Sequence, residues 1–470
     1  MKVHLSTLGC KLNESELEAW ARKFANDGYE IVDDAKNADI IVLNTCTVTH
    51  VAARKSRQMS RQLARANPNA RIVLTGCYVS VSPDEAKALP NVALVVPNAD
   101  KDRLVEIANR RVAWQMADSV SPNAIGDTPY AINQYWMDAD VETQVAGRKL
   151  QAAESGRRSV VGGRRTRAFV KIEDGCNMSC TYCIIPIARG KERSRPIADV
   201  VTEVKSLVDA GYKEIILTGV QISSYRVSGA NWKFALHDLV AAILSETNVP
   251  RLRLTSIAPW DLDESLLNLF SDSRLCRHLH LSLQSGSDTV LRRMRRPYST
   301  AQFERAMNIS REKIYDVGIT TDVIVGFPGE SNVEFEQSLE FVARMQFSRV
   351  HVFPYSVRSG TDAAKLPLHV SDAVKESRVK QMQAVADASM KAFAAKFIGR
   401  ELQVLWETVD SQSDFYPPTT DHRPQWSGYT DNYIRVVAPS DESLENVITS
   451  ARLINSIDDG AVGEVIRKSS

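Results

Sequence analysis

The sequence predicts an α/β protein in three parts: a small parallel α/β domain at the N-terminus, a central partial (β/α)6 barrel and a C-terminal all-β barrel. Apolar strand-like runs alternate with helix-like segments near the N-terminus, and further short apolar strands, most of them separated by helical stretches, follow in the middle of the chain. The last part is rich in strands and glycine. A chain of 470 residues is also longer than one hydrophobic core normally supports.

The first predicted domain covers residues 1–116. Its apolar runs and helix-like segments alternate as they do in parallel α/β folds. The predicted strands are Ile40–Leu43, Ile72–Leu74 and Val92–Val96, and the predicted helices are Glu14–Asn26 and Val51–Ala66. Residues 117–165 are polar and irregular, which predicts a linker or a partly ordered insertion.

The central barrel is predicted over residues 166–396 and the C-terminal barrel over residues 397–470. The strands expected in the central barrel are Ala168–Ile172, Glu214–Leu217, Arg251–Thr255, His278–Leu283, Thr320–Val325 and Arg349–Phe353. Those expected in the C-terminal barrel are Leu402–Glu407, Tyr433–Val437 and Val462–Ile466. Helix signals are few in this last part, as is typical of a small β-barrel.

Composition sets the broad class of the protein. Apolar residues make up 44% of the chain, and no stretch approaches the roughly 20 apolar residues that a bilayer span requires. The N-terminus begins directly with a strand-like run and lacks the pattern of a signal peptide, so we expect no membrane segment and a cytoplasmic location. A formal net charge of +1 neither supports nor excludes RNA binding. Seven cysteines in a reducing compartment favour metal ligands, catalytic groups or core residues over disulfides.

The strongest motif is Asp174-Gly-Cys-Asn-Met-Ser-Cys-Thr-Tyr-Cys183, which follows a predicted strand. Cys176, Cys180 and Cys183 are separated by three and two residues, and three thiolates suit an iron–sulfur cluster with one iron left open for another molecule. The alternatives are a zinc site or three incidental thiols. Structural zinc normally needs four ligands, and no local Cys or His completes this site.

A second set of cysteines lies at the ends of predicted strands in the first domain. Cys10, Cys46 and Cys77 each follow such a strand, and the C-terminal ends of parallel strands meet at one edge of a sheet. The three thiols are therefore expected to converge on a second cluster. The alternative is that each is a buried small hydrophobic residue. Cys276 has no such partner and is assigned no role.

Together these residues resemble the methylthiotransferase family of radical S-adenosylmethionine enzymes, and the match spans nearly the whole chain. The segments Thr7–Asn13, Asn44–Thr49 and Arg54–Gln58 are most similar to members that modify N6-threonylcarbamoyladenosine beside the tRNA anticodon. Lys11-Leu12-Asn13 is the discriminating feature. Members acting on isopentenyl-adenosine tend to have Gln-Met-Asn there, and those acting on a ribosomal-protein aspartate tend to have Pro-Lys-Asn. The sequence departs from the family pattern at residues 117–165 and at Asp410–Trp426.

The resemblance implies two [4Fe–4S] clusters and a radical-SAM type of central barrel. The cluster on Cys176, Cys180 and Cys183 would cleave S-adenosylmethionine reductively with an external electron donor. The cluster on Cys10, Cys46 and Cys77 would carry the sulfur, which a second S-adenosylmethionine methylates before transfer to C2 of the adenine. An aromatic C2–H lacks an easy acid–base route to substitution, so radical chemistry is the plausible one, with the protein supplying position and electrostatics.

The resemblance also implies which residues bind S-adenosylmethionine. Tyr182 is expected near the adenine, Gly219 near the methionine amino group, and Ser256, Gln284 and Asp322 along the rest of the cofactor. Gln221 belongs to the same set. All of these except Tyr182 stand toward the C-terminal ends of predicted barrel strands, where reactive centres of βα barrels lie. The alternative for each is ordinary loop polarity.

The C-terminal barrel resembles a TRAM domain, an RNA-associated module, in which Tyr429 or Tyr433 would stack on bases or pack in the core. The basic stretches that could contact tRNA phosphates, or be solvated faces, are Arg54–Arg61, Arg164–Arg167, Arg189–Arg195 and Arg292–Arg296. Three hypotheses therefore stand. They are a tRNA methylthiotransferase for threonylcarbamoyladenosine, the same chemistry on isopentenyl-adenosine or a ribosomal-protein aspartate, and a non-catalytic iron–sulfur protein that binds RNA or senses redox state.

Overall fold

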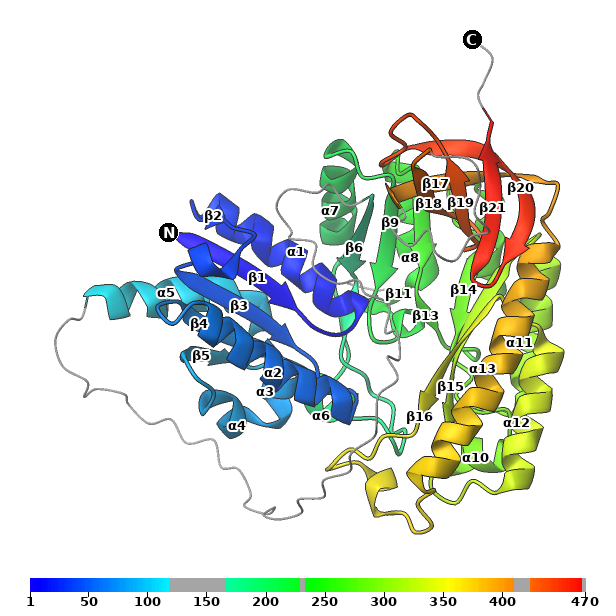
Figure 1. Cartoon of the computed structure of the whole chain (residues 1–470), viewed down its shortest axis with the longest axis horizontal. Coiled ribbons are helices and arrows are strands. Elements are labelled where there is room, and N and C mark those ends of the chain that lie inside the picture. The colour runs from blue at the N-terminus through cyan, green and yellow to red at the C-terminus, as the bar shows by residue number, and fades with distance from the viewer. Residues whose placement is uncertain (118–165, 229–232, 410–422, 467–470) are drawn as a thin grey trace.

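The computed structural model describes residues 1–117, 166–228, 233–409 and 423–466. Figure 1 shows the three predicted parts, with the N-terminal domain beside the central barrel and the C-terminal barrel at one end of the central strands. The predicted insertion at 117–165 lies outside the described residues from position 118 onward. The predicted domain bounds stay predictions. Among the described helices, none is both long enough and apolar enough to cross a membrane.

The N-terminal domain is built on a parallel sheet of strand order β2-β1-β3-β4-β5. Its strands are β1 (Lys2–Thr7), β2 (Glu30–Ile31), β3 (Ile40–Thr45), β4 (Arg71–Gly76) and β5 (Val92–Val96). Every residue of β3 is buried. Ile40 and Val42 pack into one hydrophobic cluster, whereas Ile41 and Leu43 pack into another, because successive side chains of a strand point to opposite faces. The sheet is therefore covered on both sides, as parallel sheets are.

Helices on both faces supply that cover. They are α1 (Lys11–Asn26), α2 (His50–Ala66), α3 (Cys77–Val81), α4 (Pro83–Lys87) and α5 (Leu104–Ala117). Trp20 and Phe24 of α1 pack in the cluster that contains Ile40, together with the first turns of α5. Tyr78 and Val79 of α3 pack in the cluster that contains Ile41. The predicted small parallel α/β domain is thus confirmed.

The central part is a partial barrel of parallel strands. They are β6 (Arg167–Lys171), β9 (Glu214–Thr218), β12 (Arg251–Leu254), β13 (Ser256–Ile257), β14 (His278–Leu281), β15 (Gly318–Val325) and β16 (Arg349–Pro354). One run of pairing is β12-β9-β6 and the other is β13-β14-β15-β16, with Thr255 between β12 and β13. Within the described residues β6 and β16 do not pair, so the barrel of strands stays open between them. The predicted partial barrel is confirmed.

Helices on the outside of this barrel bury its apolar face. They are α7 (Ile197–Asp209), α8 (Leu236–Glu246), α10 (Asp288–Arg293), α11 (Thr300–Lys313), α12 (Asn332–Met345) and α13 (Asp372–Ala395). The N-terminal domain lies at the open side, where α1 packs on β6. The Lys171 backbone N–H donates to Ser15 Oγ at 3.0 Å, and Arg22 forms a 2.6 Å ion pair with Glu203 of α7. At the start of α1, Lys11 Nζ lies 5.9 Å from the centroid of the Tyr433 ring.

The C-terminal part is a closed barrel of order β17-β18-β19-β21-β20, which confirms the predicted all-β barrel. Its strands are β17 (Glu401–Val409), β18 (Gln425–Thr430), β19 (Arg435–Pro439), β20 (Ile448–Ile457) and β21 (Gly460–Val465). Trp406, Val436 and Leu453 form part of its core.

The turn between β18 and β19 closes the end of the central barrel at which the strands begin. Arg253 Nη1 donates to the Asp431 carbonyl at 2.9 Å, and Asn432 Nδ2 donates to the Asp316 carbonyl at 3.2 Å. A Cβ on Gly318 would lie 2.1 Å from the Asn432 carbonyl oxygen, so the close approach of this turn requires glycine at the start of β15. We call residues 429–433 the barrel plug.

Candidate active site

The structure brings Cys10, Cys46 and Cys77 to one edge of the N-terminal sheet. They follow β1, β3 and β4, which are neighbours in the sheet, at the C-terminal ends of those strands. Burial first, and then negative charge on Cys10 and Cys77, raise the pKa of the Cys46 thiol to about 12. All three are free thiols. The convergence predicted from the strand ends is therefore present in the geometry.

Gly9, which precedes Cys10, allows the segment that carries Cys10 to lie close to Cys46. Its φ of +117° lies in the region that favours glycine, and a Cβ there would stand 2.9 Å from the Cys46 Cβ and 3.0 Å from its Sγ. Any larger residue would push the segment carrying Cys10 away from Cys46. The glycine in Thr-Leu-Gly-Cys is thus explained by the short distance between this segment and Cys46.

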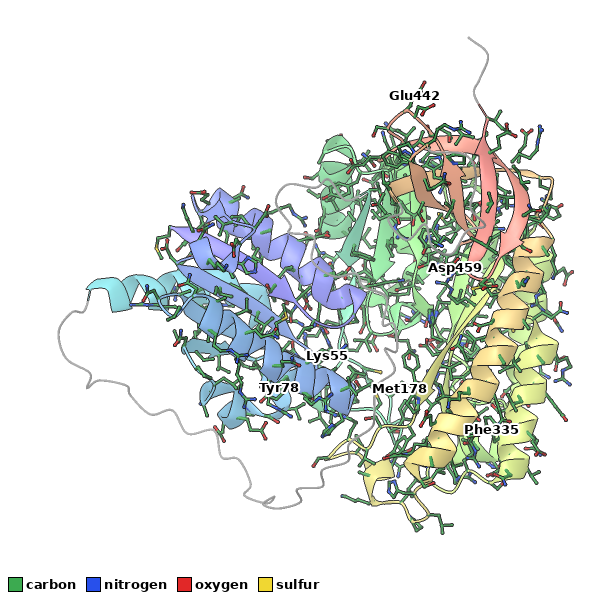
Figure 2. All side chains as sticks on the ribbon, viewed as in Figure 1. Lys55, Tyr78, Met178, Phe335, Glu442 and Asp459 are labelled. Atoms are coloured by element: carbon green, nitrogen blue, oxygen red, sulfur yellow. The ribbon has the colours of Figure 1, made fainter. Side chains whose placement is uncertain are left out.

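The second trio lies in the loop between β7 (Glu173–Asp174) and α6 (Ile185–Arg189). The Met178 backbone N–H donates to Cys176 Sγ at 3.4 Å, and the Cys183 backbone N–H donates to the Cys180 carbonyl at 3.1 Å. Burial first, and then the neighbouring Cys180 and Cys176, raise the pKa of Cys183 to about 12. In Figure 2 Met178 lies between the N-terminal domain, which carries Lys55 and Tyr78, and the barrel.

A buried ionic network joins the two cysteine loops. Arg189, at the end of α6, donates to Asn13 Oδ1 at 2.6 Å, to Asp174 Oδ1 at 2.9 Å and to Glu16 Oε1 at 3.2 Å. Lys101 Nζ lies 2.5 Å from Glu16 Oε1. Burial alone would raise the pKa of Glu16, but Lys101 and Arg189 lower it well below its usual value. Arg189 is almost fully buried, so its interpretation as a phosphate contact is wrong.

Each trio also has a polar donor beside a sulfur atom. Asn98 Nδ2 lies 3.6 Å from Cys77 Sγ and donates to the Ala188 carbonyl at 2.6 Å, which again links the N-terminal sheet to α6. Arg296 Nη1 donates to Cys180 Sγ at 3.4 Å. Such donors stabilise thiolate charge.

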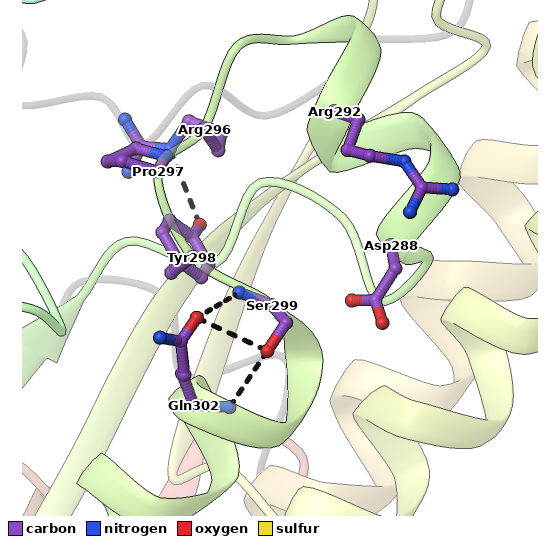
Figure 3. Close-up of a pocket in the computed structure, with 7 residues that line it drawn as sticks. All are labelled: Asp288, Arg292, Arg296, Pro297, Tyr298, Ser299 and Gln302. Carbon is purple, nitrogen blue, oxygen red and sulfur yellow. Dashed lines mark hydrogen bonds between the residues drawn. The ribbon is translucent and has the colours of Figure 1, made fainter.

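Arg296 also reaches a surface cavity of about 260 Å³ (Figure 3). Its guanidinium lies 5.0 Å from the Trp260 ring and 5.2 Å from the Tyr298 ring. The cavity is lined by Asp288, Arg292, Arg296, Pro297, Tyr298, Ser299 and Gln302. The predicted basic stretch 292–296 therefore borders the second cysteine loop as well as solvent.

Gly219 and Gln221 lie beside a carboxylate that the sequence reasoning did not single out. Glu173 Oε2 accepts the backbone N–H groups of Val220 at 2.8 Å and Gln221 at 3.0 Å. Glu173 Oε1 is buried and has no hydrogen-bond partner among the described residues. Burial raises the pKa of Glu173 to about 8. The Gln221 side chain itself donates to Asp261 Oδ2 at 3.2 Å.

The other residues predicted to bind S-adenosylmethionine do not all lie at the same level of the barrel. Ser256 begins β13, and Gln284 follows β14 with a φ of +66°, its N–H donating to the Asp322 carbonyl at 2.8 Å. The Asp322 side chain lies deeper, in the middle of β15, with its Oδ2 3.3 Å from His280 Nε2. Tyr182 packs on a small hydrophobic cluster that includes Val290, Met294, Phe327 and Tyr355.

The barrel interior holds polar residues that the sequence analysis missed. Ligand atoms of His280, Asp322 and His351 all lie within 4.8 Å of one another. His278 and His280 alternate with leucines in β14, and this period of two is the signal that places both on the inner face. Cys276, just before that strand, is buried at 1% exposure, which fits the absence of any assigned role.

Two family models match the chain. Residues 170–342 match the Radical SAM superfamily, and residues 2–97 match "Uncharacterized protein family UPF0004". A Bacillus subtilis protein named threonylcarbamoyladenosine tRNA methylthiotransferase MtaB is 35% identical over 461 residues, which cover 97% of this chain and 94% of that protein. The chain belongs to the methylthiotransferase family of radical S-adenosylmethionine enzymes.

Other relatives of this methylthiotransferase carry two names. An Aquifex aeolicus protein with the same MtaB name is 36% identical, with 86% of this chain and 92% of that protein covered. A Thermodesulfovibrio yellowstonii protein named tRNA-2-methylthio-N(6)-dimethylallyladenosine synthase is 30% identical, with 87% and 89% covered. The solved structure of the radical S-adenosylmethionine methyltransferase TsrM from Kitasatospora setae shares the fold, with a TM-score of 0.52, 16% identity and coverage of 75% of this chain and 72% of that one.

Membership of the family implies iron–sulfur clusters and S-adenosylmethionine, and the residues present fit both. Six free thiols stand in two groups of three, and Arg296 and Asn98 donate to their sulfur atoms. Thiolates are the ligands of such clusters. The orphaned Glu173 Oε1 beside Gly219 is an acceptor suited to the ammonium of a methionine group.

Proposed function

We propose that this methylthiotransferase converts N6-threonylcarbamoyladenosine at position 37 of tRNA to its 2-methylthio derivative, with consumption of two S-adenosylmethionine molecules. The observation that carries the proposal is that one arginine, Arg189, joins the loop of Cys176, Cys180 and Cys183 to the segment after Cys10. Replacement of C2–H by a methylthio group needs both a radical and a sulfur source, and two adjacent three-cysteine sites meet that need.

Each group of residues then has a defined task. When bound, the two clusters supply the electron that cleaves one S-adenosylmethionine and the sulfur that a second one methylates. Arg296 and Asn98 stabilise negative charge on the cysteine sulfurs. Glu173 holds the methionine ammonium, and Ser256 and Gln284 at the strand ends line the rest of that cofactor, with Tyr182 near its adenine.

The choice of acceptor rests on the relatives and on Lys11-Leu12-Asn13. The Bacillus subtilis and Aquifex aeolicus relatives are named for threonylcarbamoyladenosine, and they are more similar to this chain than the relative named for dimethylallyladenosine. We also propose a cytoplasmic location, where the enzyme would meet such a tRNA. An external electron donor completes the reaction.

The tRNA backbone has a candidate contact surface on α2. Arg54, Lys55 and Arg61 are exposed there, on the helix that follows Cys46. Lys and Arg side chains that neutralise phosphates make affinity depend on salt. This surface adjoins the first cysteine trio, so a bound anticodon loop would lie near the sulfur source.

The test is anaerobic reconstitution followed by analysis of tRNA nucleosides. The reconstituted chain should hold about two clusters, one lost when Cys176, Cys180 and Cys183 become Ala and the other when Cys10, Cys46 and Cys77 do. Mass spectrometry of tRNA incubated with enzyme, reductant and S-adenosylmethionine should show 2-methylthio-N6-threonylcarbamoyladenosine. Methylthiolation of dimethylallyladenosine or of a ribosomal-protein aspartate instead would reject the acceptor. Failure to form 5′-deoxyadenosine would reject the reaction.

A further inference from the structure

The inner face of the central barrel carries polar side chains between the cysteine loops and the barrel plug, and we call this group the chamber: His278, His280, Asp322, Arg349, His351 and Tyr433. Tyr433 of the plug lies at its floor, with its ring 4.6 Å from the His278 ring and 5.0 Å from the Tyr429 ring. The φ of Tyr433 is +72°, a conformation that is rare for a tyrosine and that the surrounding contacts impose. His280, Asp322 and His351 lie on the strands above it. The chamber is therefore polar from floor to middle.

Four cations are close enough for their charges to act on Tyr433, but two of them are already paired. Arg253, 4.9 Å from the ring centroid, forms hydrogen-bonded ion pairs with Glu214 at 2.7 and 3.1 Å. Arg167, 5.0 Å from the Tyr429 ring, pairs with Glu407 at 2.5 Å. These two arginines hold the plug in place and are neutralised by their partners.

The other two cations, Lys11 and Arg349, have no carboxylate partner within the described part of the chain. Lys11 enters from the first turn of α1, with its Nζ 5.9 Å from the Tyr433 ring centroid. Arg349 lies opposite Thr320 in the sheet, two residues before His351, so both side chains project from the same face of β16. The Lys11 and Arg349 charges help to lower the pKa of Tyr433 to about 8 although burial opposes this.

Asp322 faces the same chamber, where it is hydrogen-bonded to His280 and close enough to Lys11 for the ammonium charge to help lower its pKa, but it forms no ion pair with Lys11 or Arg349 within the described residues. Its Oδ2 is 3.3 Å from His280 Nε2, and His351 adds a second imidazole beside it. His280 and His351 therefore offer hydrogen-bond partners to Asp322, and burial lowers the pKa of His351 to about 4, so that this imidazole is uncharged at neutral pH. Near the floor, Lys11 and Arg349 are thus cations without an ion-paired carboxylate among the described residues.

We propose that Lys11 and Arg349, with the hydroxyl of Tyr433, bind the carboxylate at the end of the threonylcarbamoyl group of the substrate adenosine. The inference rests on the proposed function. An ammonium and a guanidinium are the groups that bind carboxylates most strongly, and a phenol adds a further donor. A dimethylallyl group carries no charge and would leave the partly buried Arg349 and the exposed Lys11 without a partner, which disfavours that acceptor. Lys11 follows Cys10 directly, so the same segment that carries one thiol also selects the substituent.

The test compares three anticodon stem–loop RNAs that differ only at position 37. They carry threonylcarbamoyladenosine, its carboxylate methyl ester, and dimethylallyladenosine. Affinity for the reconstituted enzyme is measured by anaerobic fluorescence anisotropy, and methylthiolation is measured on the same samples. The wild-type enzyme should bind the free acid about tenfold or more tightly than the ester, since a charge-assisted contact in a partly buried site is lost.

Lys11→Met and Arg349→Gln should each reduce this acid-over-ester preference, and Lys11→Arg should retain most of it. Lys380→Met and Arg344→Gln are matched controls on α13 and α12, where these side chains are exposed and paired with Glu376 and Glu304. Both should keep the wild-type preference. Arg349 is distant in sequence from every cysteine of the two trios, so its variant tests the site even if Lys11→Met loses iron.

Equal affinity of the wild-type enzyme for acid and ester would overturn the carboxylate site. If the enzyme methylthiolates both RNAs without preference, the proposed function stands and only this inference fails. If it prefers the acid in binding but does not modify it, the carboxylate site stands and the proposed reaction fails.

Discussion

Arg189 donates a hydrogen bond to the side chain of Asn13 at 2.6 Å, and this contact spans 176 positions of the sequence. Asn13 also donates to the Leu8 carbonyl at 2.6 Å and to the Thr45 carbonyl at 3.2 Å. One amide therefore fixes the segments around Cys10 and Cys46 and receives the arginine that follows Cys183. The relative position of the two cysteine trios depends on this pair.

Replacing Arg189 with Met should destabilise the protein by about 3–5 kcal/mol, because it leaves the Glu16 and Asp174 carboxylates buried with one cation fewer. Asn13→Ala should cost about 1–3 kcal/mol. The free energy of unfolding from urea titration under anaerobic conditions measures both. The double variant should show a coupling of about 0.5–3 kcal/mol, and strict additivity would mean that the contact carries no energy of its own.

Gly9→Ala should remove iron from the N-terminal trio without affecting the other. The added Cβ would meet Cys46 at 2.9 Å in a backbone conformation that alanine already disfavours. Gly28→Ala is the matched control, since Gly28 also has a positive φ, +84°, but a Cβ added there would have no atom within 4 Å. Iron analysis should give about half the wild-type content for Gly9→Ala and full content for the control. Full iron in both would show that the thiols do not need this approach.

Glu173→Gln should make stability less dependent on pH. Burial raises the pKa of Glu173 from 4.5 to about 8, so the folded protein holds a proton that the unfolded chain releases. Stability is then lost as pH rises from about 4.5 to about 8. Relative to wild type, the Gln variant should gain on the order of a few kcal/mol across that window, at about 1.4 kcal/mol per pKa unit.

Urea unfolding midpoints at pH 5 and pH 8, without S-adenosylmethionine, measure the change. Glu340→Gln, exposed on α12, is the control and should show the same pH dependence as wild type. A constant difference between Glu173→Gln and wild type at both pH values would mean that Glu173 is already ionised in the folded state.

The cysteine trios could be predicted because they follow from local rules. Cys176, Cys180 and Cys183 lie within one short loop, and the other trio follows from the fact that parallel strands end at one edge. The fold class followed in the same way from alternating strand and helix patterns. Both features can be predicted from the spacing of cysteines and the periodicity of apolar residues along the sequence.

The chamber could not be predicted, because it depends on contacts between parts of the chain that are distant in sequence. Lys11 meets Tyr433 only when the N-terminal domain closes the open side of the barrel and the plug closes its end. Arg189 belongs to a basic run that resembles a surface, yet its partner Glu16 lies 173 positions away. The sequence predicts that Tyr433 stacks on RNA or packs in the C-terminal core, whereas in the structure it packs against the central barrel.

Tyr433 should titrate near pH 8, well below its usual value of 10.0. Burial alone would raise this pKa, but the charges of Lys11, Arg167, Arg253 and Arg349 outweigh it. Ultraviolet difference spectra should show a phenolate forming near pH 8 in wild type and in Tyr315→Phe, whose side chain is 72% exposed, but not in Tyr433→Phe. Lys11→Met should shift the transition to higher pH.

The same shift has a consequence for stability. Because the folded pKa is depressed, wild type should gain stability over Tyr433→Phe as pH rises from about 8 to 10, and should lose that gain as pH falls through 8. An unchanged transition in Lys11→Met would show that Lys11 does not act on this ring. The charge that the chamber offers to a substrate carboxylate would then have to come from Arg349 alone.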